Sequence, residues 1–231
     1  AAIEENVFAG NAMSRRTQWQ YAVLLPRDPH GHVDQAIGKN VAAGNSGLIP
    51  PNRLIGKDIE EITLDGVTMV FQDVSDTEAP VEMNTWFPQF KALWSSELVT
   101  GTIHNIYTLR GAAVRNAINW SKSINETLYK FGGEAEVMFA SHSWPRWGNE
   151  RIQEVLRTQR DAYANLNNQT LHYVNQGVTI NEIHNVYEVP KGLQSKWFCR
   201  GYHGSPEHNS RGVVQRYLGF WDCNPTTLIP P

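Results

Sequence analysis

The side chains best suited to metal chemistry lie in a short polar stretch near the start of the chain. Residues 27–36 read RDPHGHVDQA and place His30, His32 and Asp34 at alternate positions. Imidazole nitrogens and carboxylate oxygens are ligands that zinc prefers. A His-x-His-x-Asp pattern begins a two-zinc site when a further His follows, but here Gln35 follows Asp34. The stretch is therefore either a metal site that lacks one ligand or a loop that only resembles one.

Three more candidate ligands lie where a loop leaves a predicted strand or short helix. Glu78 lies in DTEAPVEMN, Glu97 in WSSELVTG and His142 in ASHSWPRWG. Side chains from several segments can hold a catalytic zinc ion and leave one coordination position open for water. Without further support, a Glu in a loop is usually a solvated charge, and a His after a strand usually makes a structural hydrogen bond.

The residues up to about 147 predict short strands that alternate with polar loops. The clearest signal is a hairpin over 60–74, because two β-rich runs flank Asp65-Gly66, a dipeptide that favours a type I′ turn. Met69 and Phe71 then fall on one face of the second strand. The other predictions for this half are a buried strand over 20–26, a loop over 40–54, a helix over 115–133 and a short apolar strand within 135–142.

The residues from about 148 onward predict helices. One long helical pattern covers 149–177 and ends at Gly177, a natural stop. Thr179 is a candidate N-cap for a shorter helix that closes before Pro190. Two further helices are predicted over 191–201 and 210–222. This half carries more apolar residues than one helical layer buries, so we expect it to pack on another surface, such as a second copy of itself.

Composition narrows the class of protein. The chain has 231 residues, 41% apolar and 19% charged, which is compatible with a packed core in one or two domains. A net charge of −3 without a basic stripe argues against a nucleic-acid partner. No apolar run approaches the ~20 residues that span a bilayer, and residues 1–16 lack the features of a signal peptide. Cys199 and Cys223 are too few for a disulfide framework, and free thiols are favoured.

Several long stretches resemble one enzyme family. They are AGNAMSRR, PHGHVDQAIGKNVAAGN, TEAPVEMN, HNIYTLRGA, ASHSWPRWG, RDAYANLNNQTLHYVNQG and GYHGSPEHNSRGVVQRYLGFWDCNP. The chain is similar to the SdsA-type alkyl sulfatases, which are zinc hydrolases of the metallo-β-lactamase fold, over essentially its whole length. The resemblance implies an α/β fold over 1–147, as the C-terminal part of a metallo-β-lactamase αββα sandwich, followed by an all-α dimerisation domain over 148–231. A sterol-carrier-like domain, which follows in the family, would be absent.

The resemblance also bears on the opening motif. The family's H-x-H-x-D-H motif lies upstream of the segment that resembles AGNAMSRR, so His30, His32 and Asp34 are expected to be loop residues near the rim of the active site. Matching the remaining family positions implies that Glu78, Glu97 and His142 are this chain's metal ligands. They would hold two zinc ions together with ligands from an N-terminal part outside this chain.

The implied reaction is the hydrolysis of alkyl sulfate esters of the dodecyl sulfate kind. Arg110 matches a sulfate-binding arginine, whose planar guanidinium suits paired bonds to sulfate oxygens, and Asn105 is a second donor. His203 matches the proton donor to the departing alcohol, while His208 and Tyr217 are nearby catalytic candidates.

The resemblance further implies a homodimer and a periplasmic or secreted location. Two other interpretations stay open. The first is a zinc hydrolase of the same fold that acts on another ester, against which Arg110 argues. The second is an inactive chain that acts only as a helical dimerisation module, which the absent ligand motif keeps possible.

Overall fold

A six-stranded mixed sheet carries the loops on which most candidate site residues lie. The computed structural model describes residues 2–35, 38, 39, 47 and 49–229. The sheet order is β1-β2-β3-β4-β5-β6, and β4 and β5 are the only parallel neighbours among the described strands. The strands are β1 Ile59–Leu64, β2 Val67–Asp73, β3 Met83–Phe87, β4 Ala92–Trp94, β5 Val137–Phe139 and β6 Arg146–Trp147.

The predicted hairpin is confirmed as β1 and β2. Leu64 pairs with Val67, and the two residues between them have positive φ angles, 49° for Asp65 and 81° for Gly66. Positive φ at both central positions is what a type I′ turn requires, and Asp-Gly tolerates it. Alternation along β2 turns Val70 and Gln72 toward the core, so Met69 and Phe71 share the opposite face of the sheet.

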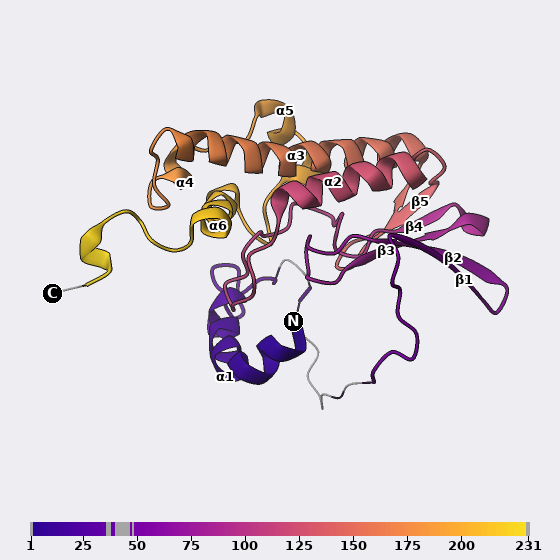
Figure 1. Cartoon of the computed structure of the whole chain (residues 1–231), viewed down its shortest axis with the longest axis horizontal. Helices are drawn as coiled ribbons and strands as arrows, with labels where there is room; N and C mark the ends of the chain where they lie inside the picture. Colours follow the sequence, from indigo (N-terminus) through magenta and orange to yellow (C-terminus); the bar gives the residue numbers. More distant parts are fainter. Residues whose placement is uncertain (1, 36–37, 40–46, 48, 230–231) are drawn as a thin grey trace.

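Two long helices cover one face of this sheet (Figure 1). Helix α2, Ala117–Thr127, begins after Asn116, whose side chain accepts a hydrogen bond from the backbone N–H of Asn119 as an N-cap. It continues into a π-helical turn, Leu128–Gly132. Helix α3, Asn149–Asn175, packs along α2. The predicted helices over 115–133 and 149–177 are therefore confirmed.

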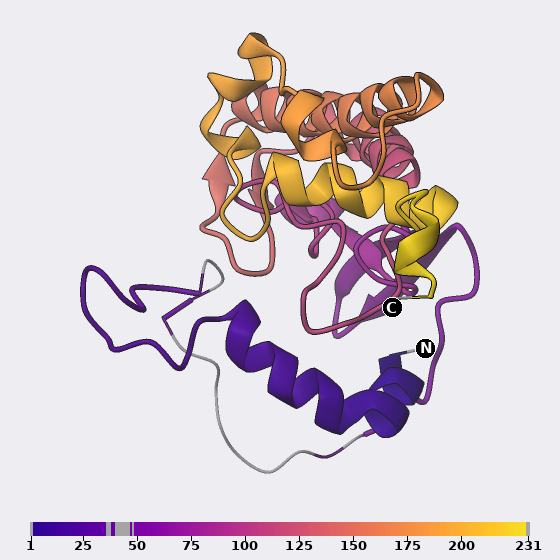
Figure 2. The same ribbon diagram turned by 90° about the vertical axis from the view of Figure 1, so that its left-hand side faces the viewer.

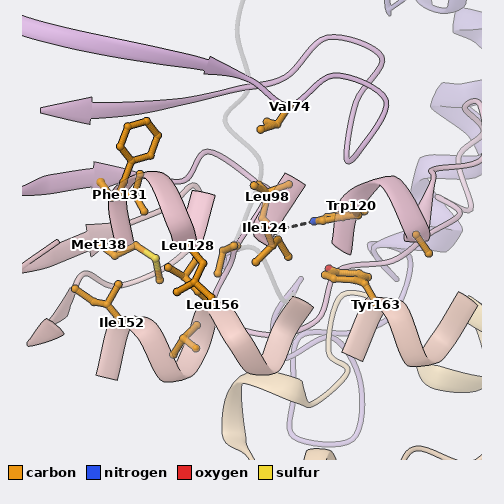
Figure 3. Close-up of a cluster of buried hydrophobic side chains, with 14 of the residues drawn as sticks. Val74, Leu98, Trp120, Ile124, Leu128, Phe131, Met138, Ile152, Leu156 and Tyr163 are labelled. Carbon is orange, nitrogen blue, oxygen red and sulfur yellow. Dashed lines mark hydrogen bonds between the residues drawn. The ribbon is translucent and has the colours of Figure 1, made fainter. Parts of the chain in front are cut away.

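The core lies between these helices and the sheet (Figure 3). Trp120 of α2 is fully buried, stacks on Tyr163 of α3 with ring centroids 4.5 Å apart, and donates its indole N–H to the carbonyl of Leu98 at 2.7 Å. The apolar residues of this core come from both sides of residue 147, as Leu98 and Leu156 illustrate. The predicted boundary between domains at 147 and 148 stays a prediction.

The N-terminal region differs from the prediction of a buried strand over 20–26. Helix α1, Ala2–Gln20, ends inside that range, and residues 21–24 form a turn with Ala22 at φ 52°. The strand prediction was wrong because no other described element covers the apolar run at Leu24 and Leu25. These residues are 63% and 51% exposed. Figure 2 shows α1 lying along one side of the molecule, apart from the α2–α3 layer.

The remaining helices are shorter than the predicted ranges, except the last one. Thr179 donates its backbone N–H and its hydroxyl to Glu182, but the helix that follows is a single turn. The last helix begins four residues before the predicted 210, because Ser205 accepts from the backbone N–H of His208 and so caps it. The bounds are α4 Ile183–Val186, α5 Lys191–Gln194, α6 Pro206–Leu218, and 3-10 turns at Pro88–Phe90, Trp197–Cys199 and Pro225–Thr227.

Three smaller predictions also meet the structure. The predicted loop over 40–54 falls largely outside the described residues. Cys199 is buried and Cys223 is exposed, and both are free thiols. Among the described helices, none combines the length and the apolar character needed to cross a bilayer.

Candidate functional site

The predicted ligands Glu97 and His142 meet because their strands are parallel neighbours. β4 and β5 lie side by side in parallel, so their carboxyl ends open at the same edge of the sheet. Glu97 lies in the turn after β4, and His142 lies in the loop after β5. The His142 Nε2 and Glu97 Oε1 atoms are 2.5 Å apart. His142 has a left-handed backbone, φ 59°, which is uncommon for a residue other than glycine and often accompanies a functional constraint.

Glu78 and a histidine absent from the sequence prediction complete the cluster. Glu78, Glu97 and His104 each offer one ligand atom, and these atoms lie within 4.8 Å of one another. The His104 Nδ1 lies 3.0 Å from the carbonyl oxygen of Asn105, which leaves Nε2 facing the Glu97 carboxylate at 3.6 Å. His104 directly precedes Asn105 in HNIY, so its place beside a predicted substrate residue was the available sequence signal.

The charges in this cluster are poorly solvated. Burial, and then the neighbouring Glu78 carboxylate, raises the pKa of Glu97, although His142 acts in the opposite direction. Burial, followed by repulsion from Glu78 and Glu97, raises the pKa of Glu82 to about 7. Burial holds the pKa of His104 well below its ordinary value. Crowded, half-buried carboxylates beside a neutral imidazole suit a bound cation.

Arg115 connects the carboxylate cluster to the predicted sulfate donor. Its guanidinium donates to the Glu78 carboxylate and to the Asn105 side-chain oxygen, and a further bond of 3.3 Å reaches the Asn105 carbonyl. The Arg115 and Glu78 side chains are only 9% and 12% exposed. One fixed cation thus orients a candidate metal ligand and a candidate substrate ligand. Sequence reasoning missed Arg115 because nothing local distinguishes it from a surface arginine.

The predicted residues Arg110 and His203 meet through Tyr21. The Arg110 guanidinium donates to the Tyr21 hydroxyl at 3.2 Å. The Tyr21 ring stacks on the His203 imidazole, with centroids 6.2 Å apart, and the His203 ring meets the His104 ring edge-on at 4.7 Å. Burial, and then the positive charge of Arg115, lowers the pKa of His203 to about 4. With this pKa, the His203 ring is neutral near pH 7. Its predicted role as proton donor instead suggests a pKa near neutrality.

Two cavities adjoin His203. The larger, of about 800 Å³, is also lined by His104 and His142 and by an aromatic group made of Trp144, Trp197, Phe198 and Tyr202. The smaller, of about 400 Å³, is lined by Gln20, Tyr21, Asn105, His203 and His208. The predicted substrate residue Asn105 and the catalytic candidates His203 and His208 therefore share one cavity.

The two other catalytic candidates, His208 and Tyr217, are not part of the cluster of Glu78, Glu97 and His104. The His208 Nε2 lies 2.6 Å from the carbonyl of Tyr107. Tyr217 of α6 is not brought to either cavity, and its hydroxyl donates to the Asn167 side chain at 3.1 Å.

The opening motif lies outside the ligand cluster. His30 is exposed, and the buried His32 has no partner for its Nε2 among the described residues. Asp34 lines both cavities, as expected for a residue at the rim.

Comparison with known proteins shows that the chain is similar to alkyl sulfatases. Residues 179–231 match the family model described as alkyl sulfatase dimerisation. The chain is 43% identical to an alkyl/aryl-sulfatase of Saccharomyces cerevisiae, over 100% of this chain and 36% of that protein. It is 42% identical to an (R)-specific secondary-alkylsulfatase of Pseudomonas, over 99% of this chain and 35% of that protein. The chain is homologous to one segment of the alkyl sulfatases.

The solved structures agree with this relation. A stereoselective inverting sec-alkylsulfatase from Pseudomonas superposes with a TM-score of 0.96 and 42% identity, over 100% of this chain and 37% of that one. The predicted fold, a mixed α/β part followed by a helical dimerisation part, is confirmed. The chain spans about a third of the length of the curated relatives that it matches.

Proposed function

We propose that the natural protein hydrolyses alkyl sulfate esters to an alcohol and inorganic sulfate at a two-zinc site. This chain would contribute Glu78, Glu97 and His142, and the other ligands would come from outside it. The observation that carries the proposal is the convergence of Glu78, Glu97 and His104 beside the chain of contacts from Arg110 to His203. The names of the relatives support it, since the two curated relatives described above and two further ones from Pseudomonas are all called sulfatases.

Zinc fits the donors that this chain offers. Carboxylate oxygens and imidazole nitrogens are its usual ligands outside thiolate sites. The raised pKa of Glu97 supports the same assignment, because a divalent cation would offset both the burial of the carboxylate and its repulsion from Glu78. His104 presents its Nε2 to the same cluster and is a further donor. When bound, zinc would polarise the ester and activate water for attack at neutral pH.

The chain's own residues would bind the sulfate and move one proton. The Arg110 guanidinium would donate paired N–H bonds to two sulfate oxygens, and Asn105 would add a side-chain donor. His203 would give its ring proton to the departing alcohol oxygen. Its pKa of about 4 applies without substrate, and a sulfate anion beside the ring would favour the protonated imidazolium and raise that pKa.

The larger cavity suggests where an alkyl chain would lie. Trp144, Trp197, Phe198 and Tyr202 present aromatic surface beside the histidines, which suits an apolar chain whose sulfate head reaches Arg110. The match to a dimerisation family supports a homodimer. The periplasmic or secreted location implied by the resemblance remains part of the proposal.

The test combines metal analysis with product release. The natural protein should contain zinc and release inorganic sulfate from sodium dodecyl sulfate, and Glu97→Gln should lose both. Glu136→Gln is the matched control, because that carboxylate is 56% exposed and its ion-pair partner is the exposed Lys91. Sulfate release that survives both Glu97→Gln and a chelator would overturn the zinc assignment. Faster cleavage of a carboxylic or phosphoric ester of the same chain length would instead favour the other hydrolase.

A further inference from the structure

The end of α1 holds the loop that carries Arg110 through polar contacts. Arg16 donates to the carbonyl of Leu109 at 2.8 Å and to the hydroxyl of Tyr107 at 3.2 Å. Gln20, one turn later, lies against the backbone of the next residue, Arg110. The described side chains of α1 do not belong to the hydrophobic core cluster. These contacts are therefore a main link between α1 and the loop.

The Gln20 side-chain oxygen accepts two hydrogen bonds from this loop. The hydroxyl of Thr108 donates at 2.8 Å, and the backbone N–H of Arg110 donates at 2.7 Å. The Gln20 nitrogen is buried and has no hydrogen-bond partner among the described residues. The orientation of the amide is therefore set by the two donors on its oxygen, and the contribution of Gln20 to this loop is that of an acceptor.

The same few residues also hold the Arg110 side chain. Tyr21, next to Gln20, accepts from the guanidinium. Gln20 thus holds the backbone of Arg110 while its neighbour holds the charged end. Both residues line the cavity that contains Asn105 and His203. A guanidinium forms paired bonds to an anion only when its plane is correctly aimed, and aim depends on the backbone from which the side chain extends.

We propose that Gln20 is a positioning residue for sulfate binding, in which its side-chain oxygen fixes the backbone of Arg110 and so aims the guanidinium at the sulfate oxygens. The proposal rests on the sulfate-binding role proposed above for Arg110. Gln20 acts through Arg110 and does not itself contact the sulfate. Thr108 shares the acceptor but carries no charge, so its bond holds the loop without aiming a substrate ligand.

The test is a double-mutant cycle in the natural protein, with inorganic sulfate as the probe in calorimetry. Gln20→Met keeps the approximate length of the side chain and removes the acceptor. Sulfate affinity should fall about 10- to 100-fold, the range expected when a binding group is displaced by up to about 1 Å. KM for dodecyl sulfate should rise more than kcat falls, and zinc content should not change. In the Arg110→Ala background, Gln20→Met should have no further effect on sulfate affinity.

Arg16→Met is the matched control for loss of anchoring. It breaks two bonds between α1 and the same loop but leaves the hydrogen bonds of Gln20 to Thr108 and Arg110, and of Tyr21 to Arg110, in place. Sulfate affinity should change less than about threefold, because the free energy of binding should change by less than the net contribution of about one hydrogen bond. A similar loss of affinity in both variants would assign Gln20 a merely structural role and overturn the proposal.

The outcomes also separate this proposal from the proposed function. If Arg110→Ala leaves sulfate affinity unchanged, the sulfate-binding role of Arg110 fails, and this inference fails with it. If Arg110→Ala weakens sulfate binding but Gln20→Met does not, only the positioning role fails. An effect of Gln20→Met that persists in full without the Arg110 side chain would also contradict it, because Gln20 would then act by another route.

Discussion

Replacing Arg115 by methionine should destabilise the protein far more than losing an ordinary ion pair. The Arg115 and Glu78 side chains are 9% and 12% exposed, so the variant would leave a carboxylate nearly buried without its cation. Breaking a buried pair on one side typically costs about 3–5 kcal/mol. The matched control is Lys196→Met, whose pair with Glu154 is 41% and 46% exposed and is worth about 0–1 kcal/mol.

The assay is urea unfolding of the natural protein and both variants, with a chelator present so that metal binding does not contribute. A second substitution gives a sharper result. Glu78→Gln added to Arg115→Met should cost less than the two single changes together, because the amide leaves no buried charge uncompensated. If Arg115→Met changes the free energy of unfolding by less than ~1 kcal/mol, as the exposed control is expected to, the reasoning from burial fails.

Three further changes test the fold around the site. Tyr163→Phe should cost about 1–3 kcal/mol in urea unfolding, because the buried backbone N–H of His104 donates to the Tyr163 hydroxyl at 3.1 Å and would lose its partner. Gly204→Ala should weaken sulfate binding, since a Cβ added at φ 124° would lie 2.8 Å from the Cα and Cβ of the candidate sulfate donor Asn105, whereas Gly177→Ala, at φ 91° in open space, should leave binding intact. Burial raises the pKa of the Cys199 thiol from 9.0 to about 11. The thiol therefore adds to the free energy of unfolding below pH 9, and this contribution is lost as the pH rises toward 11. In urea unfolding measured across this pH range, Cys199→Ala should show a smaller loss of stability than the natural protein.

Local chemistry determined the regular elements that were predicted correctly. The Asp65-Gly66 turn admits positive φ at two successive residues, and the apolar spacing along α2 and α3 produces one buried stripe on each helix. These signals need only neighbouring residues. The strand expected over 20–26 failed for the same reason, because a run of apolar residues does not reveal whether another element covers it.

The sequence by itself also revealed the resemblance to alkyl sulfatases and the segments that carry candidate ligands. Glu78, Glu97 and His142 were identified by resemblance, and each lies in a loop that follows a strand. Distances between these side chains were not available from the sequence. They depend on the parallel pairing of β4 with β5, which brings residues 45 positions apart into contact.

Only the tertiary structure decided which polar residues join the site. His104, Arg115 and Gln20 carry no local pattern that separates them from ordinary polar residues. Arg115 meets a carboxylate 37 positions away, and Gln20 meets the Arg110 backbone 90 positions away. The physical reason is that a hydrogen bond requires an approach to about 3 Å, and across such separations that approach is set by strand order and helix packing.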